Sequence, residues 1–258
     1  MNTPAWAREP FSSFIDYHER IHSFYHLTVD GLGIIIHSSQ RLEELTRELE
    51  ELDHRQIEDD GTRKAARLRA EKAKWEVDNG FPTLHEQQIV ALWTSLECLI
   101  EDFLIAWMAN TPSSMQLDDI RKVRISISDY QQMQDLDRYH YLLGELGRTA
   151  KSAFRRGCDK FEEILSFFGL SGQIEASVKR NLFELESARN VLLHRRGIVD
   201  HRFIQACPWI KAENGAKLII GREHFERYSG AVFDYSEIVL KRVKAHFASI
   251  SAPGSSGD

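Results

Sequence analysis

The sequence contains little cysteine and no cysteine pattern that indicates a cross-linked or metal-bound framework. Its 258 residues include three cysteines, Cys98, Cys158 and Cys207, which are far apart and form no C-x-x-C pair. Widely spaced thiols in an odd number are typical of a reduced protein and argue against disulfides or a zinc site. We therefore expect a cytoplasmic protein without metal or cofactor, in which Cys158 is a structural thiol although arginines precede it.

Signals for export or membrane insertion are also missing. Residues 1–30 lack the basic start and apolar run of a secretory signal. The most apolar stretch, residues 89–108, approaches the length of a membrane span but contains Glu97, Glu101 and Asp102. Charges are costly at the centre of a bilayer, so we interpret this stretch as a buried core helix and expect no membrane partner.

Common catalytic signatures are absent, with one exception. The sequence contains no G-x-S-x-G, no G-x-x-x-x-G-K-[ST] and no G-x-G-x-x-G. His18-Glu19-Arg20-Ile21-His22 does match the zinc motif H-E-x-x-H. The match begins close to the start of the chain, leaves little sequence for a sheltering sheet, and lacks the downstream extension. We interpret these histidines as polar residues bordering an apolar helix face.

Acidic residues outnumber basic ones, yet the basic residues cluster. The chain has 39 Asp and Glu against 33 Lys and Arg, while residues 148–202 hold 11 basic and 7 acidic residues. Arg148, Lys151 and Arg155 are spaced by three and four positions, so they would form one stripe on a helix. Such a stripe contacts phosphates in nucleic-acid-binding proteins, but it is as often a solvated face.

Helical periodicity dominates as far as residue 196 and predicts a mainly α protein. We expect helices at about 9–29, 32–58, 83–109, 148–169, 173–196 and 222–248, arranged as an up-and-down bundle. Between the last two, Asn214-Gly215 and the flanking apolar segments within residues 198–220 predict a small β-hairpin near the C-terminus.

The expected organisation has three parts. Residues 1–82 form N-terminal helices, residues 83–250 form the main helical domain, and residues 251–258 form a disordered tail. A turn at 59–61 separates an acidic segment from a basic one, which predicts an antiparallel hairpin. The first segment carries a 3-4-3 seam typical of helix pairing: Leu42, Leu45, Leu49 and Leu52. The charged hairpin is either a solvated structural face or an arm that docks a partner.

The segment from Arg189 to Asp200 concentrates residues able to bind phosphate and move a proton. It reads R-N-V-L-L-H-R-R-G-I-V-D, with Gly197 as a helix stop. Asn190 and His194 are four residues apart on one helix face, and Glu186 lies one turn earlier. Arg189 lies about 140° around the helix from His194. A second copy of the helix across a two-fold axis would ease that geometry by forming a shared cleft.

In this segment the chain resembles the HEPN superfamily, most closely the RiboL-PSP-type domains. The match consists of the R-N-x3-H element, its R-R-G-I-V-D sequel and the preceding apolar helix around residues 95–104, and it covers about residues 84–248. The resemblance implies a HEPN-like helical bundle, commonly dimeric, and a metal-independent endoribonuclease of toxin–antitoxin or antiphage systems. It implies Arg189, Asn190 and His194 as active-site residues, with support from Glu97 or Glu101. HEPN toxins silenced by AMPylation carry a tyrosine two residues after the histidine, where this chain has Arg196.

The residue types suit metal-free RNA cleavage. Histidine can accept the 2′-OH proton, arginine can stabilise the charge on the phosphorane, and Asn190 can orient either group. We expect Arg195, Arg196, Arg148, Lys151 and Arg155 to bind RNA phosphates, and Glu97, Glu101 and Glu186 to support the site. Expected partners are RNA, a second copy that completes the site, and an antitoxin or defence protein. The alternative is a non-catalytic HEPN module that binds RNA, a nucleotide or a protein.

Overall fold

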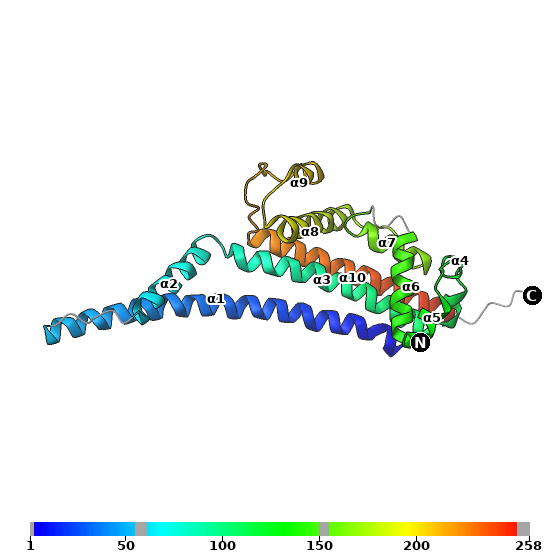
Figure 1. Ribbon diagram of the computed structural model, residues 1–258, viewed down its shortest axis with the longest axis horizontal. Helices are drawn as coiled ribbons and strands as arrows, with labels where there is room; N and C mark the ends of the chain where they lie inside the picture. The colour runs from blue at the N-terminus through cyan, green and yellow to red at the C-terminus, as the bar shows by residue number, and fades with distance from the viewer. Residues whose placement is uncertain (1–2, 55–60, 150–154, 252–258) are drawn as a thin grey trace, which may run out of the picture.

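The computed structural model describes residues 3–54, 61–149 and 155–251, and these residues form helices and loops without a strand (Figure 1). This confirms the mainly α class. The elements are α1 (Ala5–Asp53), α2 (Thr62–Asp78), α3 (Pro82–Asn110), η1 (Pro112–Gln116), α4 (Asp118–Arg121), α5 (Ile127–Gln132), α6 (Asp135–Thr149), α7 (Asp159–Phe167), α8 (Ala176–Arg195), α9 (His201–Ala206) and α10 (Arg222–Ser251).

Helix α3 lies at the centre of the body and confirms the core helix expected at 83–109. It begins with Pro82 at its first position, where a missing N–H costs nothing, and ends just before Pro112. Its buried residues occupy most of the circumference of the helix, and exposed residues such as Thr94, Cys98 and Glu101 lie together on the remaining side. The first part of α1, α8 and α10 surround it, so that Phe11, Trp93 and Tyr235 belong to one hydrophobic core.

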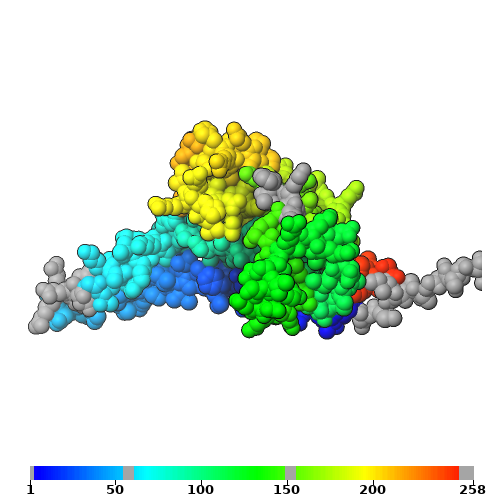
Figure 2. Space-filling model, turned by 45° about the vertical axis from the view of Figure 1, so that its right-hand side comes forward, coloured from blue at the N-terminus to red at the C-terminus, as the bar shows by residue number. Residues whose placement is uncertain are grey.

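Helix α1 is a single 49-residue helix where two helices were expected. Its first part packs in the body, and its second part projects from it with α2, as Figures 1 and 2 show. We call Ile34–Asp53 together with α2 the arm. The acidic and basic segments of the arm lie against each other as expected, with Arg67 Nε 2.9 Å from Glu43 Oε1. The expected turn residues 59 and 60 lie outside the described residues, and Gly61 precedes α2 in a left-handed conformation.

The leucine seam predicted in the arm does not join α1 to α2. Small residues fill the contact between the two helices instead, with Ser39 and Ala73 buried there. The leucines at 42, 45, 49 and 52 remain 39%, 40%, 53% and 80% exposed. The seam predicted helix pairing, and within the described residues α2 is not the helix that it pairs with, because α2 approaches α1 on a different face that carries small side chains.

The helix expected over 148–169 is also wrong. Helix α6 ends at Thr149 and α7 begins at Asp159, and Arg155 to Cys158 form a non-helical connection. Gly157 has φ +61°, a left-handed conformation that a continuous helix cannot contain. Arg148 and Arg155 therefore do not share a helical stripe, and Lys151 lies outside the described residues.

The β-hairpin expected within 198–220 is not confirmed. The described residues there form one isolated antiparallel bridge, between Ile198 and Lys217, with α9 inserted in the intervening chain. Helix α10 confirms the final helix and extends to Ser251, while residues 252–258 of the expected tail lie outside the described residues. The domain boundary at residue 82 stays a prediction, and side chains from both sides of it contribute to the core.

No described helix combines the length and hydropathy needed to cross a membrane.

A buried carboxylate fixes α8 to the rest of the body. Glu184 is 1% exposed and accepts hydrogen bonds at 2.6 Å from both Trp209 Nε1 and Tyr228 OH, and it also pairs with Arg227. Buried charges are retained when they are fully paired, and here the donors come from α10 and from the segment after α9. These bonds thus fix the position of α8 one turn before the segment that carries the candidate site residues.

Candidate functional site

The C-terminal end of α8 forms the floor of the candidate site. The helix ends at Arg195, and Arg196 and Gly197 follow with φ values of 55° and 78°. This confirms the predicted helix stop, since two successive left-handed residues reverse the chain and glycine adopts that conformation without strain. Backbone hydrogen bonds then fix the chain where it leaves α8: Leu218 N donates to Gly197 O at 2.7 Å, and Val199 N donates to Ala216 O at 2.9 Å.

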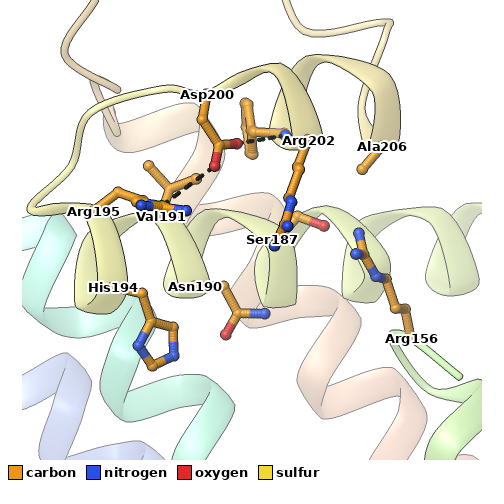
Figure 3. A pocket seen from close by; sticks show the side chains of 10 residues that line it. Arg156, Ser187, Asn190, Val191, His194, Arg195, Asp200, Arg202 and Ala206 are labelled. Carbon is orange, nitrogen blue, oxygen red and sulfur yellow. Dashed lines mark hydrogen bonds and ion pairs between the residues drawn. The ribbon is translucent and has the colours of Figure 1, made fainter. Parts of the chain in front are cut away.

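Asp200 turns the chain back over α8. Its carboxylate accepts a hydrogen bond from Phe203 N at 2.9 Å and so caps the short helix α9. The same carboxylate lies 3.4 Å from Arg195 Nε, which ties the cap to the end of α8. These donors hold the pKa of Asp200 below its ordinary value, the Phe203 N–H most strongly. Helix α9 therefore lies over the side of α8 that carries Val191 and Arg195, whereas Asn190 and His194 point away from α9 in the view of Figure 3.

A cavity of about 340 Å³ lies between α8, α9 and the connection before α7 (Figure 3). That volume suits a small ligand or one nucleotide. Asn190 and His194 point to the same side of α8, and Arg202 extends from α9 toward Ser187. The lining residues are Arg156, Ser187, Asn190, Val191, His194, Arg195, Asp200, Arg202, Phe203 and Ala206.

The cavity is rich in positive charge. Three arginines line it, and Asp200 is the one acidic residue among its lining residues. Within the described residues, Asp200 pairs with Arg195, whereas Arg156 and Arg202 form no ion pair. Two guanidinium groups at one concave site thus form no direct ion pair within the described residues, which favours an anionic ligand, and phosphate fits their planar fork.

A close contact places Arg156 at this cavity. A Cβ on Gly157 would lie 2.9 Å from Phe183 Cα, closer than real side chains allow, so only glycine permits the connection to lie on α8. Gly157 N also donates to Glu186 Oε2 at 2.6 Å. Burial raises the pKa of Glu186, although the Gly157 N–H and Lys160 oppose the rise. Glu186 thus supports the site from behind rather than from within it.

Arg189 does not line the cavity. Its Nη1 donates to Asn190 Oδ1 at 3.1 Å, and its Nη2 lies 3.9 Å from Glu97 Oε2. Lys160 holds the same Glu97 at 2.5 Å and lies 3.7 Å from Glu186. The side chain of Arg189 therefore points toward Glu97 on α3, and it touches the cavity only through Asn190.

The other predicted site residues are dispersed. Arg195 lines the cavity, while Arg196 is exposed at the helix stop outside the lining. Arg148 pairs with Glu145 on α6, and Arg155 lies 3.9 Å from Glu163. Glu101 pairs with His140 of α6 at 3.0 Å, away from the cavity lining. Of the predicted set, the structure brings Asn190, His194 and Arg195 together and links Arg189, Glu97 and Glu186 behind them.

The H-E-x-x-H histidines lie elsewhere, against α10. The Nε2 atoms of His18 and His22 lie 3.1 Å and 2.9 Å from the same Ser229 Oγ. Burial, with a smaller contribution from the neighbouring His22, lowers the pKa of His18 to about 4. The described residues contain no group of three metal-ligating side chains. Burial also raises the pKa of the Cys158 thiol to about 12, so it stays protonated near neutral pH, as a structural thiol does.

The sequence did not predict that two of the cavity's arginines, Arg156 and Arg202, lie at the same site. Arg156 and Arg202 are 46 positions apart in sequence, and their meeting depends on the Gly157 contact and on α9. Part of this could be predicted: Asp200 immediately before an apolar-containing segment is a helix N-cap signal, and it indicates a turn back at that point. Nothing in the sequence indicated that Gly157 packs on Phe183.

Comparison with known proteins adds no family or fold neighbour. The chain matches no protein-family model, no curated protein and no solved structure.

Proposed function

We propose that this chain is a metal-independent endoribonuclease with a HEPN-like bundle, and that its active site is the cavity between α8 and α9. One observation carries the proposal: His194 and Asn190 line the same cavity as three arginines, two of which have no ion pair among the described residues. A proton-transfer group beside unpaired guanidinium groups is the minimum equipment for phosphodiester transesterification without a metal. The resemblance of residues 189–200 to the HEPN element supports the same chemistry.

Each residue then has a distinct role. His194 is exposed at the cavity and accepts the proton of the ribose 2′-OH. Arg156 and Arg202 hold the phosphate and stabilise the charge that grows on it. Asn190 binds a phosphate oxygen, or holds the imidazole, through its amide. Arg189, expected from the sequence to bind phosphate itself, becomes a positioning residue, because it reaches the cavity only by its hydrogen bond to Asn190.

The reaction follows from these positions. The 2′-oxygen attacks phosphorus as its proton passes to His194, and the bond from phosphorus to the 5′-oxygen breaks. The 5′-oxygen leaves with a proton from solvent. The products are a 2′,3′-cyclic phosphate and a 5′-hydroxyl, and DNA resists because it has no 2′-OH.

The test is incubation of the purified protein with single-stranded RNA in EDTA. Wild type should release fragments that end in a 2′,3′-cyclic phosphate, and His194→Ala should be slower by about 10² to 10⁴-fold, the usual contribution of a general base. His201→Ala is the matched control, because His201 is an exposed histidine on α9 outside the cavity lining. Equal cleavage by wild type and His194→Ala would assign the activity to a contaminant and refute the proposal.

A second function is favoured by the ion pairing of Arg189. An arginine that is half-buried and held toward Glu97 is the arrangement expected of a non-catalytic module that binds RNA or a nucleotide. Such a protein would bind RNA in the cavity and leave it intact. Fluorescence anisotropy with an RNA whose 2′-OH groups are methylated measures binding without cleavage, and both functions predict binding that needs Arg156 and Arg202. Cleavage of the unmodified RNA separates the two functions, because only the first predicts it.

The expected homodimer with a shared cleft, and an antitoxin or defence partner, stay predictions. The described cavity already contains His194, Asn190 and the arginines of one chain. A mixture of His194→Ala and Arg202→Glu chains tests sharing: restored cleavage in the mixture requires a site built from two copies, and its absence places the whole site in one chain.

A further inference from the structure

The arm exposes a row of leucines whose spacing is that of a coiled-coil seam. Leu42, Leu45, Leu49 and Leu52 follow one another at intervals of three, four and three, which places all four on one stripe of α1. They keep between 39% and 80% of their surface exposed, and Leu52 is the most exposed of them. An apolar stripe of this regularity on a helix surface is typical of a surface that packs against another helix.

Within the described residues, no helix of the same chain covers that stripe. Helix α2 packs on a neighbouring face of α1 through small side chains, with Ser39 and Ala73 buried between them and Arg67 paired with Glu43. The leucine stripe lies beside this contact, centred about 80° around α1 from Thr46, a half-buried residue of the face toward α2. As far as the described residues show, the stripe is therefore open to a partner outside the chain.

A second copy of the same stripe fits it in an antiparallel arrangement. In such a pair, positions a and d of the heptad face each other, so Leu42 meets Leu52 of the second copy and Leu45 meets Leu49 of the second copy. The two-fold axis repeats both layers. The four leucines of each chain thus form four layers, and each layer contains one leucine from each copy. The surface is thus complementary to itself under the commonest symmetry of protein dimers.

The charges that flank the stripe favour the antiparallel orientation. Arg41 and Glu48 occupy the g positions, and Thr46 and Asp53 occupy the e positions. An antiparallel pair lines up the g positions of both copies on one side of the seam. The order along it is Arg41, Glu48 of the second copy, Glu48 and then Arg41 of the second copy, so that each glutamate has an arginine beside it and the row is neutral.

A parallel pair does not bring Arg41 beside Glu48. It places the g positions of one copy beside the e positions of the other, so Glu48 lies next to Asp53 of the second copy on both sides of the seam. Arg41 then lies next to Thr46, which carries no charge. In the single chain, Arg41 forms an exposed pair with Glu44 at 3.2 Å, and it can exchange this for Glu48 of a neighbour at little cost.

We infer that the arm is a self-association surface, on which the leucine stripes of two copies pack antiparallel with reciprocal Arg41–Glu48 pairs. A stable interface buries roughly 800 Å² on each partner, more than four leucines supply. The association is therefore weak, reversible and dependent on protein concentration. It does not depend on the chemistry of the α8–α9 cavity.

The experiment measures the mass of the full chain by sedimentation equilibrium over a wide range of concentration. Wild type should show a self-association step that Leu45→Glu weakens by at least about 30-fold, since it places two carboxylates in the seam. Arg47→Glu is the matched control, because Arg47 is an exposed position on the opposite side of α1 and should leave the step unchanged. Circular dichroism shows whether each variant keeps its helix content.

Charge reversal tests the orientation. Arg41→Glu and Glu48→Arg should each weaken self-association by roughly fivefold, because the row of g positions becomes wholly acidic in the first variant and wholly basic in the second. An equal mixture of the two variants should restore the step, since acidic and basic side chains then alternate along that row. No folding defect can produce that restoration. A parallel pair predicts the opposite for Glu48→Arg, which would strengthen the association by pairing with Asp53.

Two results overturn the inference. One is a wild-type mass that stays monomeric at the highest concentration. The other is an association step that Leu45→Glu leaves intact, which would place the contact on the body. An association that is lost in Leu45→Glu but not restored in the mixed charge variants would refute the antiparallel pairing.

Discussion

Two helical segments of this chain carry histidines beside cationic or polar neighbours, and their surroundings differ. His18 and His22 on α1 are packed against α10 and share a hydrogen bond with one serine, Ser229. His194 on α8 is exposed and lines a cavity with three arginines. The first pair matches a known catalytic motif and lies in the packing of the body, while the second residue matches a weaker spacing and lies in an open site. Accessibility and neighbouring charge, rather than the motif, distinguish them.

The largest expected effect separates the two sites by activity. His194→Ala should reduce RNA cleavage by about 10² to 10⁴-fold without changing the unfolding midpoint, because an exposed side chain contributes little packing. His22→Ala should do the opposite: the rate stays within about twofold of wild type, and stability falls by about 1 kcal/mol as the bond to Ser229 is lost. Cleavage assays and urea unfolding of both variants measure this. A large loss of cleavage rate in His22→Ala would contradict the assignment of a structural role to His22 and a catalytic role to His194.

The next effect tests how the cavity is held. Gly157→Ala should destabilise the protein by about 2 kcal/mol and weaken RNA binding, because the left-handed backbone and the 2.9 Å approach to Phe183 both exclude a Cβ. Gly144→Ala, on α6 with open space around the added carbon, is the matched control and should be neutral or stabilising. Urea unfolding and anisotropy measure both properties. Wild-type binding in Gly157→Ala would show that the connection does not position Arg156.

The third effect is a pH dependence of stability that comes from His18, a half-buried histidine. Burial lowers the pKa of His18 from 6.5 to about 4, so in this range the unfolded chain binds a proton that the folded chain does not. Stability should therefore fall as the pH drops from about 6.5 to 4, by about 1 to 2 kcal/mol after allowance for its partial exposure. His18→Gln should reduce the fall, while His22, His85 and His224, whose pKa values burial also lowers, keep contributing to it, and unfolding midpoints across this range measure the difference. An equal fall in both proteins would assign the dependence to other groups.

The smallest effect concerns the arginines of the cavity. Arg202→Ala should weaken binding of non-cleavable RNA by about 3- to 10-fold and reduce the slope of log affinity against log salt by about 1. Arg121→Ala, on α4 and outside the cavity lining, should change neither quantity. Anisotropy titrations at several salt concentrations measure the slope. An unchanged slope in Arg202→Ala would show that its guanidinium does not contact a phosphate.

The sequence predicted those parts of the fold that depend on local periodicity. The core helix at 83–109 and the last helix follow from their apolar pattern, and the end of α8 follows from Gly197. The predicted 148–169 helix was wrong because Arg155 and Arg156 are not helical and Gly157 has a left-handed conformation. The spacing of charged residues does not show where a helix is interrupted, whereas the left-handed conformation of Gly157 does.

Less of the candidate site was predictable. Asn190 and His194 share a face because helix geometry fixes positions four apart, and the cavity contains both. The role expected for Arg189 could not be read in the same way, since the residue that attracts its guanidinium, Glu97, lies 92 positions earlier in the sequence. Arg156 and Arg202 required the tertiary contacts of the Gly157 connection and of α9. Residues joined by one helix are predictable, and residues joined by packing are not.

The unbroken course of α1 connects the arm mechanically to the body. At 49 residues the helix is about 70 Å long, and its first turns are held in the core by Phe11 and Phe14 while its last turns bear the leucines. A rod held at one end acts as a lever. A tilt of α1 by a few degrees in the core moves its far end by several ångströms. A force applied to that far end likewise acts as a torque on the helices that surround α3. A load at the far end of α1 is therefore carried by the same helix that packs in the hydrophobic core.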